Sequence, residues 1–317
     1  MTTRSRFLML LAIVATLALA LVGAGCGGDG EGGSSEEDAG ALLERAFNKQ
    51  VTSADLELDL KAELDGLPEL RGPLTLSLSG PYGSDDPKEL PVLDWNIVAK
   101  GAGQSYDVGL KVTEDNAFVE YQGESYEAGT QLFDKLKQQY AASQPEGQPT
   151  LKSLGLDPSS WLEDGTIEDG EDIGGDPTRT ISGSVDIEKV IKDFIAFTKS
   201  DLFRRQAEAQ GQPLPDFEQP TDEEIKEIED QIDELTLEVD VDDNDIARRL
   251  LVQADFTVPE DEVEEGDVKG GTLSISYALN DVGVEPDVQA PANPKPFSEL
   301  IQQLGPLLGG GLASPTP

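Results

Sequence analysis

The stretch "ADLELDLKAEL", residues 54–64, alternates strictly between apolar and charged side chains. Its apolar members are Ala54, Leu56, Leu58, Leu60, Ala62 and Leu64, and its charged members are Asp55, Glu57, Asp59, Lys61 and Glu63. Because successive side chains of a β-strand point to opposite faces, this alternation predicts a strand with one apolar and one solvated face. Such a strand belongs to an antiparallel sheet that is covered on one side only.

The same alternation recurs at short spacing along the rest of the chain. Glycine-rich or aspartate-rich turns separate the segments, which predicts an antiparallel meander of nine or ten strands rather than a series of βαβ units. One of these segments, residues 235–258, is typical of a hairpin that turns around Asp242 to Asp245. The other segments are "PLTLSLSG" (73–80), "LDWNIVAK" (93–100), "QSYDVGLKVTED" (104–115), "AFVEYQGESY" (117–126), "TRTISGSVD" (178–186) and "GGTLSISYALNDV" (270–282).

Four segments carry an apolar stripe at helical spacing, namely residues 39–50, 130–140, 185–203 and 221–235. The last begins with Thr221 and Glu224 at the spacing of a capping box and continues with Ile225, Ile228 and Ile232. A few amphipathic helices and one long sheet with a single apolar face predict an α+β fold, in which the helices pack on the concave face of a curved antiparallel sheet.

The apolar face of this sheet is the candidate functional surface. If the sheet curls, the helices can cover it incompletely and leave an apolar cavity. In the alternative, which periodicity alone favours, the helices fill the concavity and the apolar face is ordinary core. Eight residues on the apolar phase are candidates for the cavity wall: Leu58, Leu76, Trp95, Ile97, Leu110, Leu237, Val239 and Ile275.

The first 25 residues have the layout of an export signal. Arg4 and Arg6 precede an apolar run from Phe7 to Val22, which is shorter than the ~20 residues of a comfortable transmembrane helix. The run ends at "GAGC", which contains Cys26, the single cysteine of the chain, and resembles the lipobox of bacterial lipoproteins. That resemblance implies removal of residues 1–25 and acylation of Cys26. Gly23 departs from the branched apolar residue of the family pattern, and the alternatives are cleavage nearby by an ordinary signal peptidase or an uncleaved anchor.

The remaining chain divides by composition. Residues 26–38 contain "GGDGEGGSSEED", an acidic, glycine-rich stretch that predicts a flexible tether behind the acylated cysteine. Residues 39–300 form the predicted domain, with an acidic insertion near 198–234, and residues 301–317 form a C-terminal tail.

The charge of the chain excludes several partner classes. Without Arg4 and Arg6, 21 basic residues stand against 63 acidic ones, a net charge of −42. Nucleic acid is excluded because phosphate binding draws on clustered Lys and Arg. Adsorption to anionic lipid is opposed as well, so membrane attachment has to come from acyl chains. Solubility, or a salty or acid-rich proteome, accounts for the excess of acidic residues.

Catalytic and metal-binding chemistry finds little support. The chain has no histidine, so a Ser-His-Asp triad is excluded, and no cofactor or metal site is predicted. Asp240, Asp242 and Asn244 match the first ligands of an EF-hand loop, but Asp245 replaces its glycine and Leu251 its bidentate glutamate, so a tight β-turn is favoured. The carboxylates of "EDGTIEDGEDIGGD" could serve glycoside hydrolysis, although solvation is the ordinary role of such loops. The protein is therefore predicted not to be an enzyme.

The order of the segments resembles the actinobacterial LprG/LppX lipoproteins, which are similar in fold to the LolA and LolB carriers and to the N-terminal domain of RseB. The resemblance covers roughly residues 39–300. Its most specific parts are "GEDIGGDPTRTISGSVD", "VDVDDNDIARRLLV" and "NDVGVEPDVQAP", and none of them is a catalytic motif. The insertion at 198–234 and the tail "LGGGLASPTP" depart from the family pattern.

The resemblance implies a half-barrel sheet wrapped over helices, with a cavity for acyl chains. The implied protein is anchored by lipid to the extracytoplasmic face of the cell membrane and carries lipids or glycolipids within the cell envelope. The alternative is a scaffold or sensor lipoprotein of the same fold with a filled core, which binds another envelope protein through the acidic insertion.

Overall fold

The structure is a computed structural model, and it describes residues 38–67, 72–144, 151–200, 204, 221–261, 263 and 268–304. The predicted leader, Cys26 and almost all of the tether lie outside these residues, as do about half of the acidic insertion and most of the C-terminal tail. Within the described part of the chain no helix is long and apolar enough to cross a membrane.

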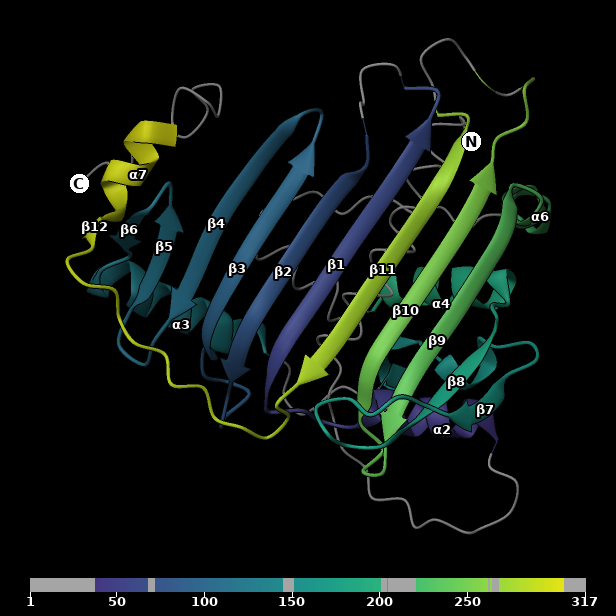
Figure 1. Cartoon of the computed structure of the whole chain (residues 1–317), viewed down its shortest axis with the longest axis horizontal. Helices are drawn as coiled ribbons and strands as arrows, with labels where there is room; N and C mark the ends of the chain where they lie inside the picture. Colours follow the sequence, from purple (N-terminus) through teal and green to yellow (C-terminus); the bar gives the residue numbers. More distant parts are fainter. Residues whose placement is uncertain are drawn as a thin grey trace.

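One sheet organises the described residues (Figure 1). Its twelve strands lie in the order β12-β6-β5-β4-β3-β2-β1-β11-β10-β9-β8-β7 and do not close into a barrel. Every neighbouring pair is antiparallel except β12 and β6, which are parallel. The bounds are β1 Ser53–Asp65, β2 Leu74–Gly83, β3 Val92–Gly101, β4 Gln104–Val112, β5 Ala117–Tyr121, β6 Glu124–Glu127, β7 Thr166–Asp169, β8 Thr178–Ser184, β9 Ile232–Asp242, β10 Ala247–Thr257, β11 Gly270–Asn280 and β12 Lys295–Pro296.

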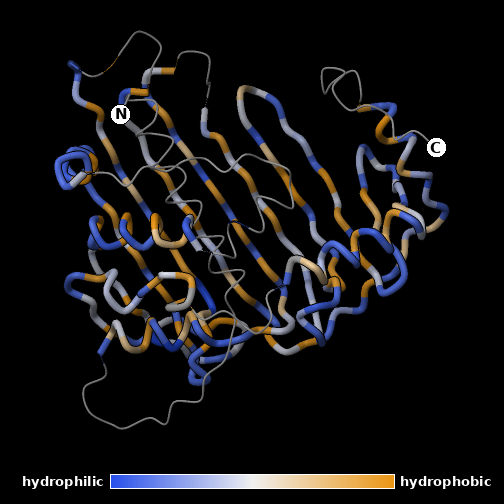
Figure 2. Tube along the Cα trace, turned by 180° about the vertical axis from the view of Figure 1, so that it is seen from behind, coloured by the Kyte–Doolittle hydropathy of each residue, from blue (hydrophilic) through white to orange (hydrophobic). Residues whose placement is uncertain are grey.

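The alternating strand at residues 54–64 is the central member of the sheet. Leu58 faces Leu78 on β2 and Tyr277 on β11, so β1 joins the meander β2–β6 to the later strands β7–β11. Apolar positions alternate with polar ones along the neighbouring strands too (Figure 2). The side chains of one phase therefore form a continuous apolar face, and those of the other phase form a polar face.

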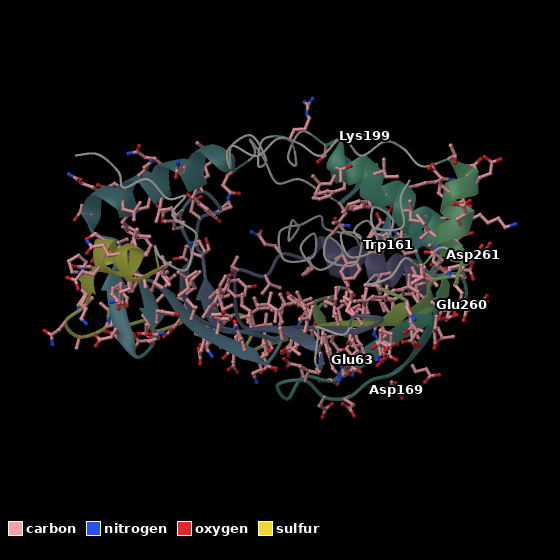
Figure 3. The ribbon with its side chains drawn as sticks, turned by 90° about the horizontal axis from the view of Figure 1, so that it is seen from above. Glu63, Trp161, Asp169, Lys199, Glu260 and Asp261 are labelled. Carbon is pink, nitrogen blue, oxygen red and sulfur yellow. The ribbon has the colours of Figure 1, made fainter. Side chains whose placement is uncertain are left out.

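The described helices are α2 (Ala39–Asn48), α3 (Thr130–Ser143), α4 (Ile187–Thr198), α6 (Asp222–Glu229) and α7 (Phe297–Leu304), with short 3-10 turns at Leu151–Leu154 and Pro158–Ser160. Helices α2, α3 and α4 lie on the same side of the sheet, and the sheet bends towards them (Figure 3). The predicted fold, a curved α+β half-barrel with helices on its concave face, is confirmed.

Side chains fix where several helices begin. The Asp38 carboxylate accepts a hydrogen bond from the Ala41 amide, and Asp186 accepts one from the Lys189 amide. Thr221 and Glu224 form the predicted capping box at α6. These contacts satisfy amide groups that have no partner within the first turn of a helix.

Several details differ from the sequence-based expectation. The segment 221–235 was expected to be one helix, but α6 ends at Glu229 because Ile232 pairs with Phe256 and begins β9. The expected helix at 185–203 is shorter, as α4 covers 187–198. Strands β7 and β12 and helix α7 were not predicted, and the parallel pairing of β12 departs from a purely antiparallel sheet.

Both edges of the sheet are short. Strand β7 has four residues and includes Glu168 and Asp169, and strand β12 has two residues. Pro296 on β12 has no backbone N–H and cannot donate to a further strand.

Three clusters of buried side chains lie on the concave face. The main core joins α2, α4 and α6 to strands β8–β11 and includes Leu42, Ile191 and Val239. The α3 core places Phe133 against Leu93, Val112 and Ala117. A small central cluster of Ala54, Leu56 and Leu279 lies between them.

Candidate functional site

A continuous apolar row crosses the concave face. Cross-strand pairing places its members side by side on ten of the twelve strands, from β5 at one end to β7 at the other. The row consists of Tyr121, Val108, Ile97, Leu78, Leu58, Tyr277, Leu250, Val239, Ile181 and Ile167. The helical side of the sheet thus offers one apolar surface that is longer than either helical cover.

Part of this surface belongs to none of the three clusters. Leu76, Ile97, Ala99 and Val108, which we call the open strip, lie on β2, β3 and β4 between the α3 core and the main core. Leu76 is 37% exposed and the other three are half-buried. Tyr106, the cross-strand partner of Ala99 on β4, is 52% exposed. The open strip is therefore apolar surface that the described helices leave partly uncovered.

Helix α3 also leaves apolar surface exposed. Its first turn is held by Phe133, which is buried against the sheet, whereas Leu136 is 38% exposed. Leu132 and Tyr140, on the same stripe, are half-buried, and burial raises the pKa of the Tyr140 hydroxyl. The apolar stripe of α3 is thus only partly used by the α3 core.

The eight predicted wall residues all lie on the apolar face, but in different surroundings. Leu237, Val239 and Ile275 are at most 4% exposed and belong to the main core. Leu76 and Ile97 lie in the open strip. The remaining three are half-buried at its borders: Leu58 packs against the main core, and Trp95 and Leu110 pack against the α3 core.

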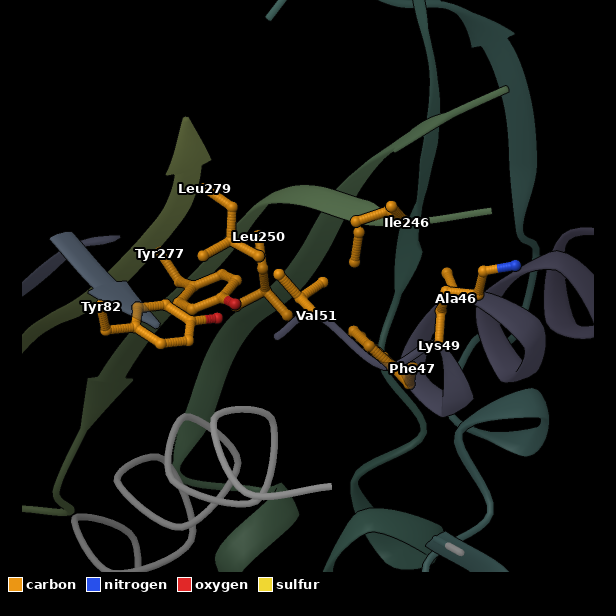
Figure 4. A pocket seen from close by; sticks show the side chains of 10 residues that line it. Ala46, Phe47, Lys49, Val51, Tyr82, Ile246, Leu250, Tyr277 and Leu279 are labelled. Carbon is orange, nitrogen blue, oxygen red and sulfur yellow. The ribbon is translucent and has the colours of Figure 1, made fainter. Parts of the chain in front are cut away.

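A small cavity of about 50 Å³ lies where the main core meets the central cluster (Figure 4). Two tyrosines that the sequence analysis did not select, Tyr82 and Tyr277, line it. Its other lining residues are Ala46, Phe47, Lys49, Val51, Ile246, Ala247, Leu250 and Leu279. Tyr277 shares the apolar phase of Ile275, so the alternation could have indicated it, whereas Tyr82 follows "SGP" and reads as part of a turn.

The two phenols are neutral at ordinary pH. Burial raises the pKa of Tyr82 to about 12, and burial together with the neighbouring Tyr82 raises the pKa of Tyr277 further. Desolvation disfavours the charged phenolate, so both groups stay protonated and keep a hydrogen to donate.

The two tryptophans of the chain differ in their polar contacts. Trp161, in the main core, donates from its indole Nε1 to the Asp193 carboxylate at 2.8 Å. The Trp95 Nε1 is buried and has no hydrogen-bond partner among the described residues. Trp95 packs against both the α3 core and the central cluster, so its unpaired donor lies in the region between the helical covers.

The convex face brings two of the signature segments together. Arg248, from "VDVDDNDIARRLLV", donates to Asp242 at 3.2 Å and to Asp176, from "GEDIGGDPTRTISGSVD", at 2.6 Å. Arg249 pairs with Asp240 at 2.6 Å. The two segments therefore form a polar framework that ties the β7–β8 connection to the β9–β10 hairpin.

The same contacts explain the residues that resemble an EF-hand. One oxygen of Asp242 accepts hydrogen bonds from the backbone amides of Asn244 and Ile246, which closes the predicted tight turn. The carboxylate of Asp240 is used by Arg249 and by the Thr180 hydroxyl. Within the described part of the chain no group of three side chains is arranged to hold a metal ion.

A wider, open groove of about 560 Å³ lies over strands β3–β6. Its lining is mainly polar and includes Asn96, Asp107, Glu120 and Ser125. These side chains belong to the polar phase of their strands, so this groove offers little apolar surface and is a weaker candidate for an apolar ligand.

The fold defines the class of the protein: an α+β half-barrel built on one unclosed sheet. In structure the chain is similar to two mycobacterial lipoproteins, as the sequence resemblance predicts. Lipoprotein LppX from Mycobacterium tuberculosis is 13% identical, with a TM-score of 0.36 over 80% of this chain and 100% of the other. LprF from Mycobacterium bovis is 13% identical, with a TM-score of 0.38 over 82% of this chain and 100% of the other. No protein-family model matches the chain, and no curated protein is significantly similar in sequence.

Proposed function

We propose that the protein is an envelope lipoprotein, anchored through acylated Cys26, that binds acyl chains of lipids or glycolipids on its concave face and carries them within the cell envelope. The observation that supports this proposal is the open strip, an apolar surface between two helical covers in which Leu76 is exposed. An apolar chain placed there gains about 0.8 kcal/mol for each methylene removed from water, without any polar recognition.

We assign roles to the eight predicted wall residues according to what surrounds each of them. Leu58, Leu76, Trp95, Ile97 and Leu110 line or border the open strip, and we assign them to ligand contact. Leu237, Val239 and Ile275 are enclosed by α4 and its neighbours, so they support the wall from within the main core.

A second candidate is a scaffold or sensor of the same fold that binds another envelope protein through the acidic insertion. The closed main core favours it, because the cavity under Trp161 measures only about 20 Å³ and the cavity beside Tyr82 about 50 Å³. Cavities of this size have room for about one to a few waters, so neither holds an acyl chain as it stands. Ligand binding in the first candidate therefore depends on the open strip.

Native mass spectrometry separates the two candidates. The sample is residues 39–317, which lack the leader and the cysteine, secreted to the envelope of the native host. The lipid-binding proposal expects an added, dissociable mass that corresponds to an acylated lipid. A clean mass of the protein alone, repeated after acylated lipids are offered, contradicts that proposal and favours the scaffold.

A polar substitution in the open strip gives a sharper version of this test. Leu76→Gln should weaken binding of a fluorescent acyl probe about five- to tenfold, because the ligand loses apolar contact worth about 1 kcal/mol. Stability should change little, since Leu76 is already 37% exposed. Val284→Gln, a substitution at a residue 59% exposed and outside the strands, is the matched control and should bind as the unmodified chain does. Equal binding by both variants would place the ligand elsewhere.

A further inference from the structure

The C-terminal helix lies at one end of the apolar face. Helix α7 packs on β6, where its Gln303 Nε2 donates to the Tyr126 hydroxyl at 3.0 Å. Tyr126 is 1% exposed and faces Val119, which in turn faces Leu110, one of the wall candidates. Tyr126 therefore belongs to the concave face, and α7 lies on the same side of the sheet as α3 (Figure 3).

The apolar stripe of α7 is only partly used in this contact. Leu300 is 3% exposed, whereas Phe297, Ile301 and Leu304 are half-buried. Leu304 is the last residue of the helix. The chain continues with residues 305–317, which we call the terminal segment and which lie outside the described part of the chain. The terminal segment is thus attached to an apolar surface on the concave side of the sheet.

The composition of the terminal segment is unusual for this chain. From Leu300 to Pro317 there is no charged residue, although 27% of all residues are charged. Behind the leader, no other stretch of this length lacks charge. The terminal segment carries Leu307, Leu308 and Leu312 among glycines and prolines. Because burial of apolar side chains is favourable, these leucines gain free energy when an apolar surface removes them from water.

The open strip lies within reach of the terminal segment. Four strand spacings, about 20 Å, separate β6 from β2, and half of that separates β6 from β4. An extended chain covers about 3.5 Å per residue, so the terminal segment can span about 45 Å. From the end of α7, Leu308 can therefore reach Val108 on β4, and Leu312 can reach Leu76 on β2.

Other occupants fit the open strip less well. The acidic insertion near 198–234 would bring carboxylates onto an apolar surface, where they lose water without gaining a cation. A second molecule has to be drawn from solution. The terminal segment is attached close to the surface, so its effective concentration there is roughly millimolar. It is therefore the favoured occupant.

We propose that the terminal segment, through Leu307, Leu308 and Leu312, covers the open strip when no ligand is bound, with α7 as its fixed anchor. Ordering a glycine-rich chain costs conformational entropy, which offsets much of the gain from burying the leucines. The cover is thus one that a ligand displaces. In this last point the inference rests on the proposed function and adds regulation to it, because a ligand of the open strip has to compete with the terminal segment.

Disulfide trapping tests the cover without any ligand. The sample is residues 26–317 with Cys26→Ser, which has no cysteine. Each of the three leucines is changed in turn, as in Leu308→Cys, and combined with Leu76→Cys or with the control Ser79→Cys, at an exposed residue on the polar face of the same strand. A disulfide needs its two Cα atoms within about 7 Å. At least one pair with Leu76→Cys should therefore give about five times the intramolecular disulfide of its control, measured by peptide mapping at two protein concentrations.

Binding of the hydrocarbon probe diphenylhexatriene tests the consequence for a ligand. Truncation after Leu304 removes none of the described residues and should tighten binding about threefold or more, because the probe no longer competes with the terminal segment. Leu307→Ser/Leu308→Ser/Leu312→Ser keeps the length of the chain and should tighten binding to the same extent. The conservative variant Leu307→Met/Leu308→Met/Leu312→Met keeps apolar side chains of similar size and should restore the affinity of the unmodified chain.

Each other outcome has a definite meaning. Equal disulfide yields with Leu76→Cys and Ser79→Cys, or a probe affinity that truncation leaves unchanged, overturns the cover and leaves the proposed function standing. Disulfide-linked dimers that replace the intramolecular product as the protein concentration rises also overturn it, because a second copy then covers the strip. A preference for Leu76→Cys, together with no binding of the probe by the unmodified or the truncated chain, supports the cover and contradicts the proposed function.

Discussion

Arg248 is the largest of the buried charged side chains in the described part of the chain. Only 2% of it is exposed, and its Nε donates to the Leu279 carbonyl at 3.0 Å while its guanidinium pairs with Asp242, which is also 2% exposed. A buried pair of this kind contributes little net stability over an apolar pair of similar shape, but loss of one partner leaves an uncompensated buried charge.

We expect Arg248→Met to lower the free energy of unfolding by about 3 kcal/mol, measured by urea denaturation, because Asp242 then lacks its counter-ion. Arg248→Met/Asp242→Asn should recover at least half of this loss, since asparagine still accepts from the amides of Asn244 and Ile246. A double variant as unstable as Arg248→Met would mean that the arginine acts through its packing and not through its charge.

The eight wall candidates show how far single residues could be predicted from the sequence. Alternation placed all eight wall candidates on the apolar face, because the phase of a strand decides which face a side chain occupies. It could not distinguish Val239, enclosed in the main core, from Leu76, exposed in the open strip. That difference depends on where α3 and α4 pack, and strand periodicity carries no information about helix placement.

At the scale of the element, helix α4 is held at its start by one carboxylate. Asp186 accepts from the Lys189 amide at 3.0 Å and pairs with the Lys189 ammonium at 2.8 Å. Burial raises the pKa of the Asp186 carboxyl, but the hydrogen bonds and charge of Lys189 outweigh it, and the net pKa is lowered from its ordinary value of 3.8. The folded state therefore binds this proton less readily than the unfolded chain does.

Asp186→Ala should cost about 1 kcal/mol at pH 7, the usual effect of losing an N-cap. Because its pKa is lowered on folding, the ionised Asp186 carboxylate stabilises the folded state at pH values above the pKa of the unfolded chain. This stabilisation is lost as the pH falls through the lower pKa of the folded state, so the cost of Asp186→Ala should shrink below about pH 4. Asp186→Asn keeps a neutral cap acceptor and should retain most of the stability, with less dependence on pH. Urea unfolding between pH 3 and pH 7 measures both variants, and a cost that is constant over this range would contradict the role of the charge.

Long elements were predicted well and short ones poorly, for a physical reason. Strand β1 has enough alternating residues for its two-residue period to be recognised in the sequence. Strands β7 and β12 have only four and two residues, so their formation depends on pairing with neighbours that are distant in sequence. Ile232 fits both the helical stripe of α6 and the alternation of β9. Its pairing with Phe256 on β10 assigns it to the strand, which is a tertiary effect.

At the scale of the whole molecule, the main feature is the large excess of acidic residues. With 63 acidic residues against 21 basic ones after the leader, the folded chain brings many like charges closer than the unfolded chain does. Compactness is then opposed by self-repulsion that salt can screen.

We therefore expect the urea midpoint at pH 7 to rise between about 10 mM and 0.5 M NaCl, because the screening length falls from ~30 Å to a few ångströms. The same salt increment near pH 4, where many carboxyl groups are protonated, should have a smaller effect. A midpoint that does not respond to salt at pH 7 would show that the acidic residues are spaced too widely to repel one another.

Because the sheet is not closed, its two edge strands could pair with strands of other molecules. Exposed strand edges are templates on which a second molecule can add its own strand, and repeated addition yields fibres. Here one terminus of the sheet offers four residues with two negative charges, and the other offers two residues, one of which is a proline. Growth by edge pairing is thus disfavoured at both ends of the described sheet, although the sheet does not close on itself.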